Sequence, residues 1–203
     1  METDTPSIIT PPAAPVLMGS EPIRGAQGLT VSDFWRYGMP DLRSNTARGL
    51  LAQFLVHHAI GAKRQSSEWE CYDIEGDNGL RIEVKASARL QAWEQRGLSP
   101  IRFSGLKRRT WSPAFGSAEK ATYNADVYVF AVQTATAHDL YDPLDVAQWE
   151  FYVAARSAVA ARNQVSMGLS TVQGLASGPV AFDALRSAIE VVAKEELQQS
   201  GGV

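Results

Sequence analysis

Three residues near the middle of the chain have the types and spacing of a metal-dependent phosphodiesterase site. Asp73 is followed ten positions later by Glu83, and Lys85 comes two residues after Glu83. Two carboxylates can hold one Mg²⁺ or Mn²⁺, because hard divalent cations prefer oxygen ligands and keep several waters. A lysine beside them would orient a bound water or stabilise charge on a phosphate. We therefore predict all three as catalytic residues, with Asp73 and Glu83 as metal ligands.

The segments that carry these residues are typical of a β-hairpin. Residues 68–75 and 80–88 are rich in strand-forming residues and flank a Gly/Asp/Asn turn. Side chains alternate along a strand, so Glu83 and Lys85 are expected on one face. Asp73 could then share a cation with Glu83 if it points to the same side. The alternative is a solvated strand, since acid-x-lysine on an exposed face is common.

The wider sequence from Asp33 to about Ala154 resembles a bacterial family of the PD-(D/E)xK, or restriction-endonuclease-like, nuclease superfamily. The resemblance lies in segments that follow the expected order along the chain: residues 47–56, 72–73 with 82–93, 125–130 and 142–153. It implies an α/β protein with an α-β-β-β-α-β core, in which a mixed central sheet is flanked by helices. It also implies a divalent metal and a nuclease activity, and we expect DNA as the substrate and partner.

The motif positions of that family fall on Asp73, Glu83 and Lys85, and one position departs from the pattern. Relatives tend to have a glutamate where this chain has Gln53, and that glutamate joins the metal site. An amide offers a neutral oxygen but brings no charge. Gln53 is therefore expected at the rim of the site. The alternative function is a nuclease-derived module that binds nucleic acid or a protein partner without cutting.

Two further groups of residues could support such a site. Ser87 shares the predicted strand face with Lys85, and Gln91 follows where some superfamily members place a supporting glutamine; a plain helix-surface role is the alternative for Gln91. A basic cluster follows further along the chain, and three cations beside an aromatic ring could hold phosphates and stack a base. Its residues are Lys107, Arg108 and Arg109, and the alternative for them is a solvated loop.

Composition fits a cytoplasmic enzyme of modest size. The 203 residues are 45% hydrophobic and 20% charged, which is ordinary for a globular domain with a well-buried core. The net charge of −3 argues against binding driven by overall charge, though not against a basic groove. Cys71 is the only cysteine, which excludes an internal disulfide. No apolar run is long enough to cross a bilayer, so no membrane association is expected.

The chain divides into three predicted parts. Residues 1–28 are a flexible tail rich in Pro, Ala, Ser and Thr, residues 29–197 are the nuclease-like domain, and residues 198–203 are a flexible end. Besides the hairpin, we predict helices at 31–37, 44–60, 89–96 and 182–197, and strands at 101–103, 127–132 and 149–154. The core face of the helix at 44–60 is assigned to Leu50, Leu51, Phe54 and Leu55. A homodimer or a protein partner is left open.

Overall fold

The computed structural model describes residues 9, 12, 14–63 and 70–200. The chain forms two compact units, Met1–Pro40 and Asp41–Val203. The first unit contains α1 (Val31–Gly38), which confirms the short helix predicted there. Its N-cap is Thr30, whose backbone N–H donates to Asp33 Oδ2 at 2.9 Å. The boundaries predicted at residues 28 and 197 remain predictions.

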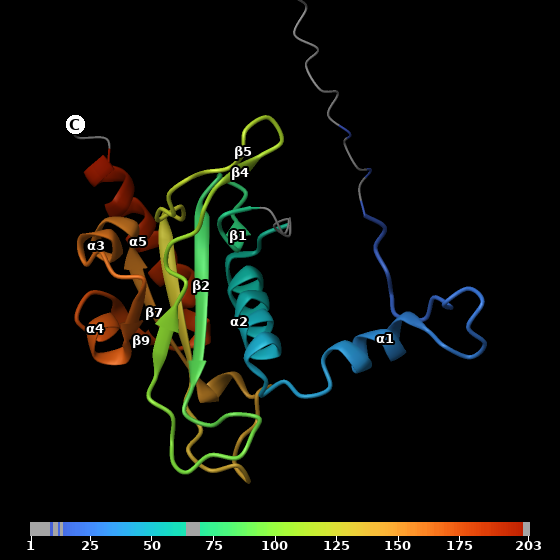
Figure 1. Ribbon diagram of the computed structural model, residues 1–203. Coiled ribbons are helices and arrows are strands. Elements are labelled where there is room, and N and C mark those ends of the chain that lie inside the picture. The colour runs from blue at the N-terminus through green and yellow to red at the C-terminus, as the bar shows by residue number, and fades with distance from the viewer. Residues whose placement is uncertain (1–8, 10–11, 13, 64–69, 201–203) are drawn as a thin grey trace, which may run out of the picture. The chain divides into compact units, whose positions relative to one another are not determined.

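The second unit alternates helices and strands (Figure 1). Its helices are α2 (Asn45–Ile60), α3 (Arg156–Ala161), α4 (Leu169–Gln173) and α5 (Leu185–Ser200), with 3₁₀ turns at Val146–Gln148 and Phe182–Ala184. Its strands are β1 (Ile74–Glu75), β2 (Arg81–Ala88), β3 (Arg102–Ser104), β4 (Trp111–Ser112), β5 (Gly116–Ser117), β6 (Val127–Gln133), β7 (Trp149–Ala155), β8 (Ser166–Gly168) and β9 (Ser177–Val180).

A mixed five-strand sheet forms the centre of this unit. Its order is β1-β2-β6-β7-β9, in which β2 and β6 run parallel and the other neighbours run antiparallel. All seven residues of β6 are buried, as expected for a central strand covered on both faces. The expectation of an α/β protein with a mixed central sheet packed against helices is confirmed.

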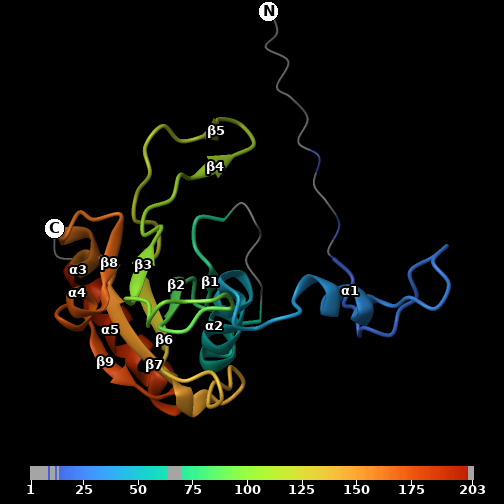
Figure 2. The ribbon, with the colours of Figure 1, turned by 60° about the horizontal axis from the view of Figure 1, so that its bottom comes forward.

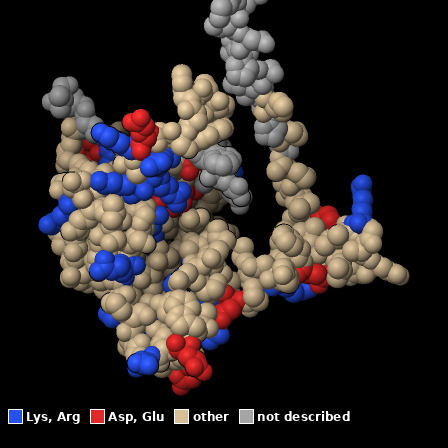
Figure 3. Space-filling model, in the orientation of Figure 1, with Lys and Arg blue, Asp and Glu red and all other residues tan. Residues whose placement is uncertain are grey.

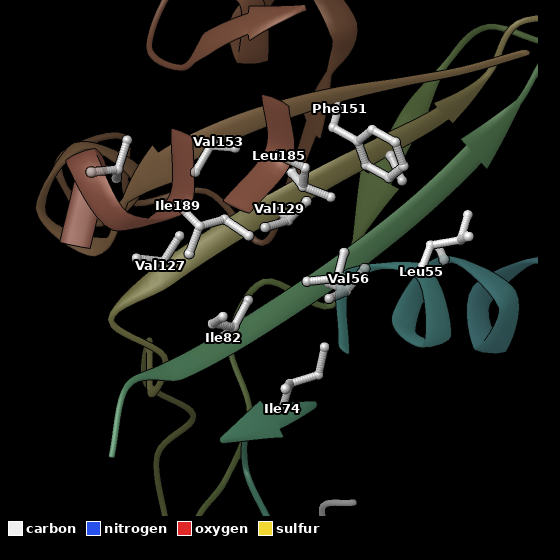
Figure 4. Packing of buried hydrophobic residues seen from close by; sticks show 14 of the residues in the cluster. Leu55, Val56, Ile74, Ile82, Val127, Val129, Phe151, Val153, Leu185 and Ile189 are labelled. Atoms are coloured by element: carbon white, nitrogen blue, oxygen red, sulfur yellow. The ribbon is translucent and has the colours of Figure 1, made fainter. Parts of the chain in front are cut away.

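Helices α2 and α5 cover one face of the sheet. Figure 4 shows Leu55 and Val56 of α2 and Ile189 of α5 against the strands that carry Ile82 and Val129. The two helices also touch each other, since the Arg186 side chain donates a hydrogen bond of 2.9 Å to the carbonyl of Ala59. This apolar layer fixes the direction of every second side chain of β2.

The opposite face is covered by a two-stranded ribbon and two short helices. Strand β3 pairs antiparallel with β8, and both lie over the sheet beside α3 and α4 (Figure 2). Phe103 of β3 and Met167 of β8 pack with Tyr128 and Phe130 of β6 in a second buried cluster. The side chains of β2 that do not face α2 therefore point toward this second layer.

Helix α2 confirms the predicted boundaries but corrects its core face. Ser44 caps its start by accepting from the Ala47 N–H at 3.3 Å, and Gly61 ends it in the left-handed conformation with φ of 68°. Leu50 and Phe54, predicted in the core, are exposed. Residues turn by about 100° along a helix, so they lie away from the buried face. That face consists of Ala47, Arg48, Ala52, Leu55 and Val56.

The first strand of the hairpin is shorter than the predicted segment 68–75. Only Ile74 and Glu75 pair as β1, residues 71–73 form bends, and residues 64–69 lie outside the described part. The backbone N–H of Val84 donates to the Asp73 carboxylate at 2.8 Å. The Asp73 side chain thus accepts the hydrogen bond from Val84 that a main-chain carbonyl of a longer β1 would have accepted.

The helix predicted at 89–96 is wrong, because these residues form an irregular loop. The Gln95 amide satisfies backbone groups that a helix would have paired internally. Its oxygen accepts from the Gln91 N–H at 2.7 Å, and its nitrogen donates to the Arg89 carbonyl at 3.1 Å. The connection from β2 to β6 therefore contains strands but no helix, which departs from the implied α-β-β-β-α-β order.

Candidate active site

Asp73, Glu83 and Lys85 gather on one side of the sheet. Glu83 pairs in register with Tyr128 of β6, so its side chain points to the face covered by the β3–β8 ribbon. Lys85 Nζ lies 2.5 Å from Glu83 Oε1. Asp73 directly precedes β1, and its backbone N–H donates to the Ile82 carbonyl at 3.0 Å, which sets it opposite Glu83. The three predicted catalytic residues thus occupy one place.

A fourth side chain joins them, because the Arg108 guanidinium bridges the two carboxylates. Arg108 Nη2 lies 3.0 Å from Asp73 Oδ1, and Arg108 Nε lies 3.1 Å from Glu83 Oε1. The carboxylate side chains are only 6% and 3% exposed, whereas the arginine side chain is 37% exposed. Both carboxylates therefore direct an oxygen toward the same cation, which enters from the solvent side.

Burial dominates the electrostatics of Glu83. Desolvation raises the pKa of its carboxyl from 4.5 to about 7, and the neighbouring Asp73 carboxylate adds to this rise. Lys85 and Arg108 oppose it, and lower the pKa. Glu83 Oε1 is within ion-pair distance of both cations but accepts no well-oriented hydrogen bond. The site therefore contains a buried oxygen whose charge is stabilised only by nearby cations.

The loop after β3 passes close to Lys85 and carries Arg108. Gly105 has φ of 69°, and a Cβ built there would lie 3.7 Å from Lys85 Nζ. The backbones of Arg108 and Thr122 exchange two hydrogen bonds of 3.0 and 2.9 Å, and the Asn124 amide donates to the Arg108 carbonyl. The main chain of Arg108 is thus fixed, while its side chain alone reaches the carboxylates.

The predicted supporting residues do not all reach the cluster. Ser87 lies on the same face of β2 as Lys85, and its hydroxyl accepts from the Arg102 N–H at 3.3 Å. Gln91 is buried beside Arg48 rather than beside the carboxylates. Gln53 belongs to α2, which packs on the opposite face of β2. Within the described ranges, no hydrogen bond or ion pair joins Gln53 to Asp73, Glu83 or Lys85.

The basic cluster divides between the site and the surface. Arg108 binds the two carboxylates, Lys107 donates to Asn163 Oδ1 at 2.8 Å and lies over the Tyr123 ring, and Arg109 is exposed. Figure 3 shows lysine and arginine side chains gathered at the base of the β4–β5 hairpin, next to acidic side chains.

Sequence reasoning missed two residues of this region. Arg108 was assigned to nucleic acid alone, although a single arginine opposite two acids could have suggested an ion-pair partner. Arg48 was not singled out. It is buried in α2. It lies one turn before Ala52 on the buried face, and this spacing could have indicated that Arg48 is buried.

In comparisons with known proteins, no family model, no curated protein and no solved structure matches this chain. None of the described helices is long and apolar enough to cross a membrane.

Proposed function

We propose that the protein is a divalent-metal-dependent nuclease of the restriction-endonuclease-like type, which hydrolyses phosphodiester bonds of DNA. The observation that carries the proposal is the convergence of Asp73, Glu83 and Lys85, with one cationic group held between the carboxylates. Two carboxylates that face one cation, beside a lysine, are a suitable donor set for phosphodiester hydrolysis. The mixed sheet beneath them supports the assignment.

The donor set fits a single Mg²⁺ or Mn²⁺. Asp73 and Glu83 would hold it, and the ion would bind Glu83 Oε1, which lies 2.5 Å from Lys85 Nζ and 3.1 Å from Arg108 Nε. The described part of the chain offers no group of three or more acidic, histidine or cysteine side chains that could hold an ion. Water would therefore complete the coordination. The ion would polarise a phosphoryl oxygen and lower the pKa of a bound water.

Two cations of the chain have roles beside that ion. The Lys85 amine, held at Glu83, would hold the attacking water or neutralise charge that grows on the phosphoryl oxygens. The Arg108 side chain is partly exposed, so it can turn from the carboxylates to an incoming phosphate. A guanidinium binds two phosphate oxygens at once, which would position the strand.

Plasmid cleavage tests this proposal. Supercoiled DNA should become nicked or linear with Mg²⁺ or Mn²⁺, and EDTA should stop the reaction. Lys85→Ala should abolish cleavage and leave the fold intact, because it removes a charged group rather than core. Lys194→Ala is the matched control, since Lys194 is exposed on α5 at the opposite face. Cleavage by Lys85→Ala at the wild-type rate would overturn the proposal.

A second candidate is a module that binds DNA without cutting it, and the Arg108 bridge favours this alternative. Arg108 and Lys85 already neutralise the two carboxylates, so the cluster could serve as a complete ion-pair network. Such a module would bind DNA equally well in EDTA. It would also give no heat in a Mn²⁺ titration, and plasmid would stay intact.

A further inference from the structure

A second polar pocket opens at the end of β2, and residues from both faces of that strand, Ala86 and Ser87, line it. It has a volume of about 460 Å³ and lies between the start of α2, the end of β2 and the loop that leads to β3. Figure 2 shows this loop in front of the sheet, between β3 and α2. None of the residues that line the pocket is acidic, and two of them are arginines, Arg48 and Arg102.

Arg48 is a buried cation without a carboxylate partner. Its residue is only 3% exposed, and its Nε is buried without a hydrogen bond. Its other nitrogens donate to the Arg43 carbonyl at 3.0 Å, the Asn45 side chain and Gln91 Oε1 at 3.3 Å, and the Tyr141 hydroxyl also lies against the guanidinium; all of these groups are neutral. In the described chain, no carboxylate lies within ion-pair distance of it. A buried charge is unfavourable unless it is paired, so a bound anion would stabilise this guanidinium.

Arg102 brings a second cation to the pocket from β3. Its guanidinium donates to Ser166 Oγ at 2.9 Å and makes no ion pair with a described carboxylate. Asn45, the first residue of α2, also lines the pocket, and the start of a long helix adds partial positive charge. The positive field of the pocket therefore has three independent sources.

Trp93 gives the pocket an aromatic wall. It lies in the loop after β2 and is 55% exposed, although a tryptophan normally hides most of its ring. An exposed indole face is a platform on which a nucleobase stacks. Arginine, amide and hydroxyl groups with an aromatic wall match a ligand that carries both a phosphate and a base.

We propose that this pocket binds one nucleotide of a polynucleotide strand, with its phosphate between Arg48 and Arg102 and its base on Trp93. Ser87 connects the pocket to the active site, because it projects from the same face of β2 as Lys85. Two residues along a strand span about 7 Å. The bound nucleotide would thus neighbour the phosphate that is cut. That placement rests on the proposed function, whereas the binding itself does not.

Binding of a labelled single-stranded oligothymidylate to the full chain in EDTA tests this inference. Arg48→Met and Arg102→Gln should each weaken binding roughly tenfold, and each should lower the salt slope by roughly 0.7. Trp93→Ala should weaken binding by a similar factor and leave the salt slope unchanged. Lys194→Gln, which loses the same charge on the opposite face, should bind like wild type. Binding by Arg48→Met and Arg102→Gln that is as tight as binding by wild type would overturn the inference.

Thermal shift with inorganic phosphate and with thymidine monophosphate separates the parts of the ligand. Both ligands should raise the melting temperature of wild type and should not raise that of Arg102→Gln. The Arg102→Gln variant therefore tests the inference even if Arg48→Met does not fold. Stabilisation by phosphate that equals stabilisation by the nucleotide would overturn the role of Trp93. If the protein binds the oligonucleotide through both arginines but never cuts DNA, the proposed nuclease activity is refuted. The inferred nucleotide-binding pocket is then still supported.

Discussion

Arg108 Nε lies 3.1 Å from Glu83 Oε1, so a cation of the chain occupies the position at this carboxylate that a proposed metal ion would take. The main chain of Arg108 is fixed by its hydrogen bonds with Thr122, and only its side chain could leave. A divalent ion would therefore compete with this guanidinium for the same oxygens. This competition separates a working metal site from a closed ion-pair network.

Arg108→Gln should tighten Mn²⁺ binding by roughly fivefold, because it removes a positive charge that repels the ion and occupies its ligands. The same change should lower cleavage, since the arginine that would bind the phosphate is lost. Calorimetric titration of Mn²⁺ and a plasmid assay measure the two effects. Arg109→Gln removes an equal charge from an exposed neighbour, and its Mn²⁺ affinity should match wild type. Weaker Mn²⁺ binding by Arg108→Gln would mean that the guanidinium supports the ion.

The sequence predicted that Glu83 and Lys85 lie on one face of β2, because the relevant rule is local. Side chains alternate along a strand, and this alone places Glu83 and Lys85 together. The turn between the two hairpin segments then determines which residue stands opposite Glu83. Only two residues of β1 pair with β2, and this short pairing is sufficient to place Asp73 opposite Glu83.

The remaining features depend on contacts that no local pattern encodes. Arg108 reaches the carboxylates because Thr122 fixes its backbone across a loop. The loop at 89–96 replaces a helix because the single side chain of Gln95 binds its backbone groups. Phe54 is exposed because α2 packs on the sheet through another side of the helix. Apolar residues lie on more than one side of α2, so the sequence alone does not show which side is buried.

The stability of the metal-free protein should depend on pH through Glu83. Its pKa is raised in the folded state from 4.5 to about 7, so its contribution to stability is complete below pH 4.5 and is lost as the pH rises through 7. Compared with Glu83→Gln, wild type in EDTA should lose roughly 3 kcal/mol of unfolding free energy between pH 4 and pH 8. Urea unfolding at several pH values measures this difference.

Added Mn²⁺ provides the control for that experiment. At pH 8 the ion should restore stability to wild type by mass action and should have little effect on Glu83→Gln. A difference between the two proteins that stays constant from pH 4 to pH 8 would show that Glu83 does not titrate in this range.

Gln53→Glu tests whether Gln53 lies at the rim of the site, as the sequence predicts, or away from it, as in the structure. Helix α2 packs on the face of β2 opposite Glu83, so the new carboxylate should not reach the metal. Mn²⁺ affinity and cleavage rate should equal those of wild type within error. Tighter Mn²⁺ binding in the variant would place Gln53 at the metal after all.

Asp73 should show two separable roles, because its two oxygens have different partners. Oδ2 accepts from the Val84 N–H at 2.8 Å, whereas Oδ1 faces Arg108 at 3.0 Å. Asp73→Asn keeps an oxygen that can accept from Val84, so the unfolding free energy should change by less than about 1 kcal/mol. Mn²⁺ affinity should nevertheless fall at least roughly tenfold, because one of two charged ligands is lost.

Asp73→Ala should weaken both properties. It leaves the Val84 N–H without its acceptor, and an unsatisfied buried donor costs about 1 to 3 kcal/mol of stability. Urea unfolding and Mn²⁺ calorimetry on the two variants compare the roles directly. If Asp73→Asn bound Mn²⁺ as tightly as wild type, Asp73 would be a structural residue of the hairpin alone, and Glu83 would lack the second carboxylate that a metal site needs.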